Sequence, residues 1–76
     1  MKAYVLIKIR TGEIEEAIRQ MHSVPGVVEA NATFGPYDGV AVIEAQDVKT
    51  IGRVVVQEIQ PIVGVLETLT CLVIDL

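Results

Sequence analysis

The sequence predicts an α+β protein with a ferredoxin-like βαββαβ fold, in which one antiparallel sheet carries two helices on one face. The first observation behind this prediction is the order of segments, since apolar stretches of strand length alternate with two stretches of helical periodicity. The second is an internal echo, because PGVVEANAT resembles VGVLETLTC with Gly26 aligned to Gly64. The offset of 64 − 26 = 38 residues is half of the 76 and indicates two βαβ halves.

The first half opens with a strand and an amphipathic helix. Residues 3–9 (AYVLIKI) are rich in β-branched and aromatic side chains, and RTG ends them. Apolar residues then recur at the helical spacing i, i+3, i+4 and i+7, at Ile14, Ala17, Ile18 and Met21. We expect Thr11 or Gly12 to cap this helix and Glu15 to pair with Arg19 four residues later.

The remaining elements are separated by turn residues. VPG ends the first helix, because Pro25 disfavours helical geometry in the residue before it. Asp47 is placed to cap the second helix, and Pro61 closes that helix. The predicted elements are strands at 27–34, 40–45 and 64–74, with GPYDG turning between the first two, and a helix with the apolar stripe Val48, Ile51, Val55 and Ile59.

Composition predicts that part of the apolar surface faces a second subunit. A chain of 76 residues is close to the lower limit for a self-sufficient hydrophobic core, yet 51% of it is apolar. Its mean hydropathy is +0.51. The strands read YVLIKI, VAVIEA and CLVI, with apolar residues at consecutive positions where a solvated face would alternate. Both sheet faces are therefore expected to be buried, the second one in a dimer of stacked sheets.

Charge and the sole cysteine argue against several classes of partner. The net charge is −4, and the six basic residues are scattered rather than gathered into a phosphate-binding surface, so no direct nucleic-acid binding is expected. No apolar run is long enough for a membrane span, and no signal peptide is evident, so we expect a cytoplasmic chain. Cys71 has no partner for an internal disulfide or a metal site and is expected to be a small buried strand residue.

The run FGPYDGVAVIEAQDVKTIGRVVVQEIQPIVGVLETLTCLVIDL carries a family resemblance. It resembles the effector-binding C-terminal domain of the Lrp/AsnC transcriptional regulators, the RAM domain. The recognisable parts are GPYDG at the turn, IVGV after the second helix and ETLT entering the last strand. The resemblance covers residues 1–76 as a single RAM domain. The DNA-binding helix-turn-helix of such regulators is absent, and Met1 leads directly into the first strand, which suggests a stand-alone effector module.

The resemblance also implies partners. It implies a homodimer of the dimeric α+β barrel type formed through the sheets, with further assembly of four dimers into an octameric ring. It implies small amino-acid effectors bound between neighbouring dimers, without a cofactor or a metal. It further suggests hetero-assembly with full-length Lrp/AsnC regulators, whose DNA-binding oligomers the module would modulate.

The residues themselves suggest how an amino acid would bind. A free amino acid requires N–H donors for its carboxylate, a negative group for its ammonium, and a pocket. Two glycines allow backbone N–H groups to turn toward the carboxylate, and an aspartate is able to pair with the ammonium. A tyrosine is able to form a wall of the pocket. Two threonines are able to supply hydroxyl groups from the adjoining dimer, as in the family. The candidate ligand-binding residues are Gly35, Tyr37, Asp38, Gly39, Thr68 and Thr70. Gly39 departs from the family, where a larger apolar residue is expected.

Other interpretations remain open at this point. Asp-Gly is a favourable hairpin dipeptide and Pro36 presets a turn, so the loop is also explained as a hairpin without a ligand. The chain would then be a purely structural assembly partner. An ACT-like amino-acid sensor shares the topology, and ferredoxin-like dimers also include enzymes. An enzyme is the weakest of these, because no catalytic arrangement is evident and His22, at a helix end, is explained by the helix dipole.

Overall fold

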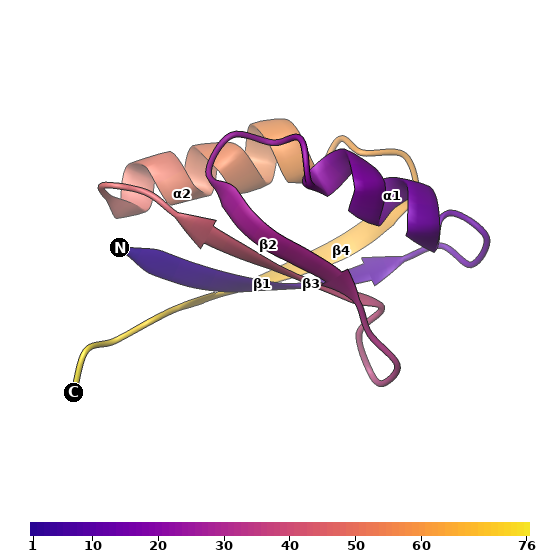
Figure 1. Ribbon diagram of the computed structural model, residues 1–76, viewed down its shortest axis with the longest axis horizontal. Coiled ribbons are helices and arrows are strands. Elements are labelled where there is room, and N and C mark those ends of the chain that lie inside the picture. The colour runs from indigo at the N-terminus through magenta and orange to yellow at the C-terminus, as the bar shows by residue number, and fades with distance from the viewer.

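The computed structural model describes residues 1–76 and confirms the predicted fold (Figure 1). A four-stranded antiparallel sheet carries both helices on one face, and the extended C-terminal residues lead away from the sheet. The elements are β1 (Lys2–Ile9), α1 (Ile14–Met21), β2 (Val27–Ala32), β3 (Gly39–Glu44), α2 (Val48–Val54), η1 (Val55–Ile59) and β4 (Val65–Leu72). Neither α1 nor α2 has the length and apolar character needed to cross a membrane.

The strands are ordered β2-β3-β1-β4, so that β1 is central and β2 and β4 form the two edges. Ile7 of β1 lies opposite Gly39 of β3 on one side and Thr68 of β4 on the other. Residues opposite each other in an antiparallel pair share a face, so this register places the side chain of Thr68 on the helix-covered face. Val5 and Thr70 form the next such pair.

The core lies between the sheet and the helices. Alternate residues of β1 point into it, which follows from the two-residue period of a strand. Met21, Ile51 and Ile59 close it from the helix side and are almost fully buried. The buried core residues are Ala3, Val5, Ile7, Ile9, Ala17, Ile18, Met21, Ala30, Ala41, Ile43, Ile51, Val55, Ile59 and Ile62.

The second helix begins as the sequence predicts, and the first does not. Asp47 Oδ1 accepts a hydrogen bond from the Thr50 N–H at 2.8 Å, which confirms the predicted cap. The bond to Thr50 holds the pKa of Asp47 below its ordinary value. Helix α1 has Glu13 at its N-cap position and no side-chain cap, so the prediction of a cap from Thr11 or Gly12 was wrong. The chain turns tightly before Glu13, whose N–H donates to the Arg10 carbonyl at 3.0 Å.

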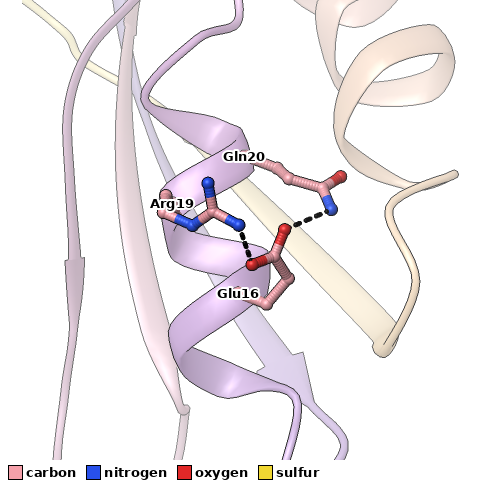
Figure 2. Close-up of polar contacts among 3 residues, drawn as sticks. All are labelled: Glu16, Arg19 and Gln20. Atoms are coloured by element: carbon pink, nitrogen blue, oxygen red, sulfur yellow. Dashed lines mark hydrogen bonds and ion pairs between the residues drawn. The ribbon is translucent and has the colours of Figure 1, made fainter.

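The ion pair on α1 also differs from the prediction. Arg19 pairs with Glu16, three residues earlier, and not with Glu15 (Figure 2). Gln20 donates a second hydrogen bond to the same carboxylate at 3.0 Å, so Glu16 is held from two sides. The hydrogen bonds from Gln20 and Arg19 lower the pKa of Glu16. Spacings of three and four residues both bring side chains together on a helix surface, and the sequence alone did not choose between them.

Two strands are shorter than predicted, and the second helix ends in a π-helical turn. Strand β2 ends at Ala32 rather than at residue 34, because Thr33 already bonds back across the loop to Asp38. Strand β4 ends at Leu72 rather than at 74, with one further backbone bond from Val73. Helix α2 continues into the π-helical turn η1, in which the Gln60 N–H donates to the carbonyl of Val55 five residues earlier, at 2.9 Å.

The structure bears out the internal echo in its backbone geometry. Gly26 and Gly64 both adopt φ = +96° immediately before an edge strand, a conformation that favours glycine. His22 Nε2 lies 2.7 Å from the carbonyl oxygen of Ala30. The equivalent residues of the second half, 38 positions later, are Gln60 and Thr68, and Gln60 Nε2 donates to the Thr68 hydroxyl oxygen at 3.0 Å. Each helix end is thereby tied to the edge strand that follows it. This contact accounts for His22 better than the helix dipole alone.

Candidate functional site

The loop between β2 and β3, residues 33–38, is held in one shape by its own hydrogen bonds. The Thr33 N–H donates to the Asp38 carbonyl at 2.9 Å, and the Thr33 hydroxyl donates to the Tyr37 carbonyl at 2.8 Å. The Asp38 N–H donates to the Ile7 carbonyl of β1 at 2.8 Å. The base of the loop is therefore fixed to the sheet, while Phe34 and Gly35 at its tip are exposed.

The carboxylate of Asp38 is already engaged within the chain. Its Oδ2 accepts a hydrogen bond from the backbone N–H of Ile9 at 2.8 Å. The bond extends the pairing of β1 with β3 beyond Ile7 and Gly39, the last pair of the ladder. The other oxygen, Oδ1, makes no hydrogen bond within the chain. Sequence reasoning missed the bond to Ile9, which only the strand register brings about.

The two candidate glycines, Gly35 in the loop and Gly39 at the start of β3, occupy different environments. Gly35 has open space around its Cα, since a Cβ there would meet no atom within 4 Å. Gly39 is buried, and a Cβ there would lie 2.8 Å from Cδ1 of Ile18 on α1. Close packing of α1 on the sheet accounts for the small residue at position 39. Tyr37 is half-buried beside this position and lines no groove of the single chain.

Thr68 and Thr70 line a groove at the opposite edge of the sheet. This groove, called here the α2–β4 groove, has a volume of about 420 Å³ and is mainly apolar. Gln60 reaches into it and donates to the hydroxyl oxygen of Thr68 at 3.0 Å. The lining residues are Val48, Ile51, Gly52, Val55, Val56, Gln60, Thr68, Thr70 and Leu72. Sequence reasoning placed Val48 in the core stripe and missed the groove, although the exposure of Val48 follows from its place in the first turn of α2.

A single chain therefore divides the six predicted ligand residues into two groups. Gly35, Tyr37 and Asp38 lie on the loop between β2 and β3, and Gly39 is the first residue of β3, whereas Thr68 and Thr70 lie on edge strand β4, which β1 separates from β3. The structure brings each group together and keeps the two groups apart. No group of three or more His, Cys, Asp or Glu is placed to hold a metal ion.

The sheet face opposite the helices is uncovered and apolar along its centre. Tyr4 and Leu69 are exposed there, and Leu6 is half-buried. Lys2 lies over the Tyr4 ring, 5.4 Å from its centre, at the margin of this face. Cys71 also lies here and is exposed, so the prediction that it is buried was wrong for the single chain. Cys71 lies opposite Tyr4 in the strand register, so both side chains lie on the face away from the helices.

The chain resembles proteins of one family over its whole length. Residues 2–75 match the family model of the Lrp/AsnC ligand binding domain. The HTH-type transcriptional regulator Ptr1 of Methanocaldococcus jannaschii is 28% identical over 57 residues, which make up 75% of this chain and 38% of that protein. The matched segment thus spans well under half of the curated regulator.

Solved structures show the same fold. TTHA0845 from Thermus thermophilus superposes with a TM-score of 0.93 at 33% identity, covering 99% of this chain and 94% of that one. The complex of the transcriptional regulator NMB0573 with L-Met from Neisseria meningitidis superposes with a TM-score of 0.85 at 18% identity. That match covers 97% of this chain and 49% of the regulator.

Proposed function

Because the chain belongs to the Lrp/AsnC ligand-binding domain family, which consists of transcription-regulator effector domains rather than enzymes, we propose that it binds a small amino acid and assembles in response. The observation that carries this proposal is the fixed loop at residues 33–38. The loop presents one carboxylate oxygen without a hydrogen bond beside open backbone at Gly35.

The chemistry of the loop suits the two charged ends of an amino acid. Asp38 Oδ1 is able to accept a charge-assisted hydrogen bond from the ammonium while Oδ2 stays bonded to Ile9. Open backbone at Gly35 lets N–H groups approach the carboxylate. Tyr37 lines no groove of the single chain, and we propose that it walls the site in the assembly. Gly39 contributes by letting α1 pack closely, and its role is to hold the loop in place. We propose that Thr68 and Thr70 of a second copy supply hydroxyl groups.

The proposed assembly starts from the uncovered sheet face. Stacking this face on that of a second copy would bury Tyr4, Leu6, Leu69 and Cys71, side chains that a single chain leaves wholly or partly open to water. The dimer would then be a unit of a larger ring. We further propose that the chain joins full-length Lrp/AsnC regulators and changes their assembly on DNA without contacting DNA itself. The relationship to the regulator Ptr1 supports a partner of this type.

A thermal-unfolding screen against the twenty amino acids tests the proposal. A ligand that binds only the folded assembly adds RT ln(1 + [L]/Kd), about 2.7 kcal/mol at a hundredfold excess over Kd, which raises the unfolding midpoint. We expect one or a few amino acids, with methionine a natural first choice given the L-Met complex of a fold relative, to raise the midpoint. No shift with any amino acid would contradict the proposal.

A second candidate function is a structural assembly partner without a ligand. One observation favours it specifically: the Asp38 carboxylate already has a partner in Ile9, which explains an aspartate at this position without any effector. The two candidates make different predictions for the oligomeric state. An assembly partner keeps the same oligomeric state with and without amino acids, whereas an effector domain changes its mass or its thermal stability.

A further inference from the structure

The α2–β4 groove has a polar end and an apolar end. Helix α2 with η1 and strand β4 run in opposite directions, because residues 60–64 join them in a short turn (Figure 1). Gln60 therefore lies beside Thr68, to whose hydroxyl oxygen it donates a hydrogen bond at 3.0 Å. Val48, the first residue of α2, and Leu72, the last residue of β4, line the opposite end. A small molecule that follows the groove thus passes from hydrogen-bonding groups to apolar side chains.

The hydroxyl group of Thr68 is placed to donate a hydrogen bond at the polar end. Its oxygen already accepts from Gln60 Nε2, so its hydrogen is available for another acceptor. Thr70 follows two residues later on the same face of β4 and adds a second hydroxyl group to the groove. Two such donors suit an oxygen of an amino acid's carboxylate. With the carboxylate at this end, the side chain of the amino acid extends toward the apolar end.

The wall of the groove contains no ionisable side chain. Its lining consists of five apolar residues, one glycine and three uncharged polar residues. A charged side chain that lay along this wall would lose contact with water and meet no counter-charge, which is unfavourable. An apolar side chain in the same place gains free energy by leaving water. The lining therefore favours an occupant whose side chain is uncharged and apolar.

Gly52 lies in the helical wall of the groove without any reason that the fold supplies. Its φ is not positive, and a Cβ on it would meet no atom within 4 Å, whereas close packing explains Gly39. Glycine in a helix interior is less favourable than alanine. Gly52 lies four residues after Val48 and four before Val56, which also line the groove, so its missing side chain widens the groove between them. Space for an occupant accounts for this glycine.

We propose that the α2–β4 groove holds the side chain of the effector, that this side chain is aliphatic or a thioether, as in leucine or methionine, and that Gly52 sets the space available to it. The groove volume of about 420 Å³ lies within the range of small-molecule pockets. The inference rests on the proposed function, which brings an amino acid to Thr68 and Thr70. It adds the class of side chain and the residue that selects it.

Calorimetric titration with two sets of amino acids tests the class of side chain. Leucine, isoleucine and methionine form the first set, and aspartate, glutamate, lysine and arginine form the second. We expect at least one member of the first set to bind and no member of the second to bind with comparable affinity. A charged or polar amino acid that binds more tightly than the whole first set overturns the inference.

Gly52→Ala tests the space in the groove. The added methyl group should weaken the binding of leucine or methionine by about tenfold or more, since one methylene group produces such discrimination in an apolar pocket. The thermal midpoint of the variant without ligand should not fall, so unfolding cannot explain the loss. Gln57→Ala is the control, because Gln57 is exposed on the same helical segment but does not line the groove. Unchanged affinity in Gly52→Ala, or an equal loss in Gln57→Ala, contradicts the inference.

Methyl NMR spectroscopy shows where the ligand lies. On titration with the amino acid that binds, the methyl signals of Val48, Val56 and Leu72 should shift. Those of Val28 and Val63, which are exposed but lie outside the groove, should stay in place. Shifts confined to methyl groups outside the groove would place the ligand elsewhere and refute the inference.

The same measurements separate this inference from the proposed function. If an amino acid binds but ignores Gly52→Ala and leaves the groove signals unchanged, the effector function stands and the groove is not its side-chain pocket. If no amino acid binds, the effector function fails and the inference fails with it.

Discussion

Asp38 Oδ2 accepts a hydrogen bond from the backbone N–H of Ile9 at 2.8 Å, which joins the loop between β2 and β3 to the end of the central strand. The neighbouring Arg10 N–H donates to the Gly64 carbonyl at 2.7 Å, just before β4. Residues 9 and 10 thus link the loop to the turn that precedes the other edge strand. Asp38 has a structural role in addition to its proposed role in binding an ammonium group, and two substitutions separate the roles.

Asp38→Asn retains an oxygen that accepts from Ile9 and removes the negative charge. We expect its free energy of unfolding to fall by less than about 1 kcal/mol, because the hydrogen bond is kept in neutral form. Asp38→Ala leaves the Ile9 N–H without a partner and should cost about 1–3 kcal/mol. Chemical denaturation measures both values. Equal stability of the two variants would show that the bond to Ile9 contributes nothing.

The same pair of variants tests ligand recognition. If Asp38 binds the ammonium through its charge, Asp38→Asn should lose amino-acid affinity while remaining folded. Isothermal titration with the amino acid that emerges from the thermal screen measures this loss. Affinity retained in Asp38→Asn and lost in Asp38→Ala would mean that the residue only holds the loop in position.

Gly39 is expected to tolerate little added volume. A Cβ at this position lies 2.8 Å from the end of the Ile18 side chain, which is able to rotate, so Gly39→Ala should be mildly destabilising. Gly39→Val adds two further carbons and should cost about 1–3 kcal/mol through overpacking. Gly52→Ala is the matched control, because a Cβ there meets nothing within 4 Å. In the helix it should stabilise by about 0.4–1 kcal/mol, as thermal unfolding will reveal.

The uncovered sheet face should be sensitive to charge if it stacks on a second copy. Leu69→Asp introduces a carboxylate at an exposed position of this face, which a single chain tolerates in water. In a stacked dimer the same carboxylate would be buried without a partner, so the dimer should dissociate to monomers. Size-exclusion chromatography with light scattering measures the mass. Val63→Asp is the control, and a Leu69→Asp chain that stays dimeric would argue against stacking.

Two exposed carboxylates predict a pH dependence of stability. The pKa values of Asp47 and Glu16 are lowered in the folded chain by hydrogen bonds from Thr50 and from Gln20 with Arg19, respectively. A lowered pKa contributes stability that is fully present above the unfolded value and is lost as the pH falls through the folded value. The unfolding midpoint should therefore decline as the pH drops below the ordinary values of 4.5 for Glu16 and 3.8 for Asp47.

Replacing the cap isolates one of these contributions. Asp47→Asn keeps an acceptor for the Thr50 N–H but does not titrate, so its midpoint should decline less steeply with acid than that of the parent chain. Differential scanning calorimetry across the acid range records the slopes. Parallel curves for the two chains would exclude Asp47 as a source of the pH dependence.

The sequence was informative wherever a local rule acts. Helical spacing marked Ile18, Met21, Ile51 and Ile59, and all four lie in the core. Asp47 was recognisable as a cap because the preference for Asp before a helix is a property of the helix end itself. The predictions failed where several neighbours competed, as with the partner of Arg19, which is Glu16 rather than Glu15.

By itself, therefore, the sequence determined the order of the elements, the face of each helix that packs on the sheet, and the family. Periodicity, turn residues and motifs each depend on residues that are close together in the sequence. The tertiary structure decided the bond of Asp38 to Ile9, the close packing of Ile18 on Gly39, and the separation of Thr68 from the loop. The first two depend on strand order and register, which bring together residues 38 − 9 = 29 and 39 − 18 = 21 positions apart in the sequence. Such contacts arise only when the whole sheet has formed, so no local sequence pattern predicts them.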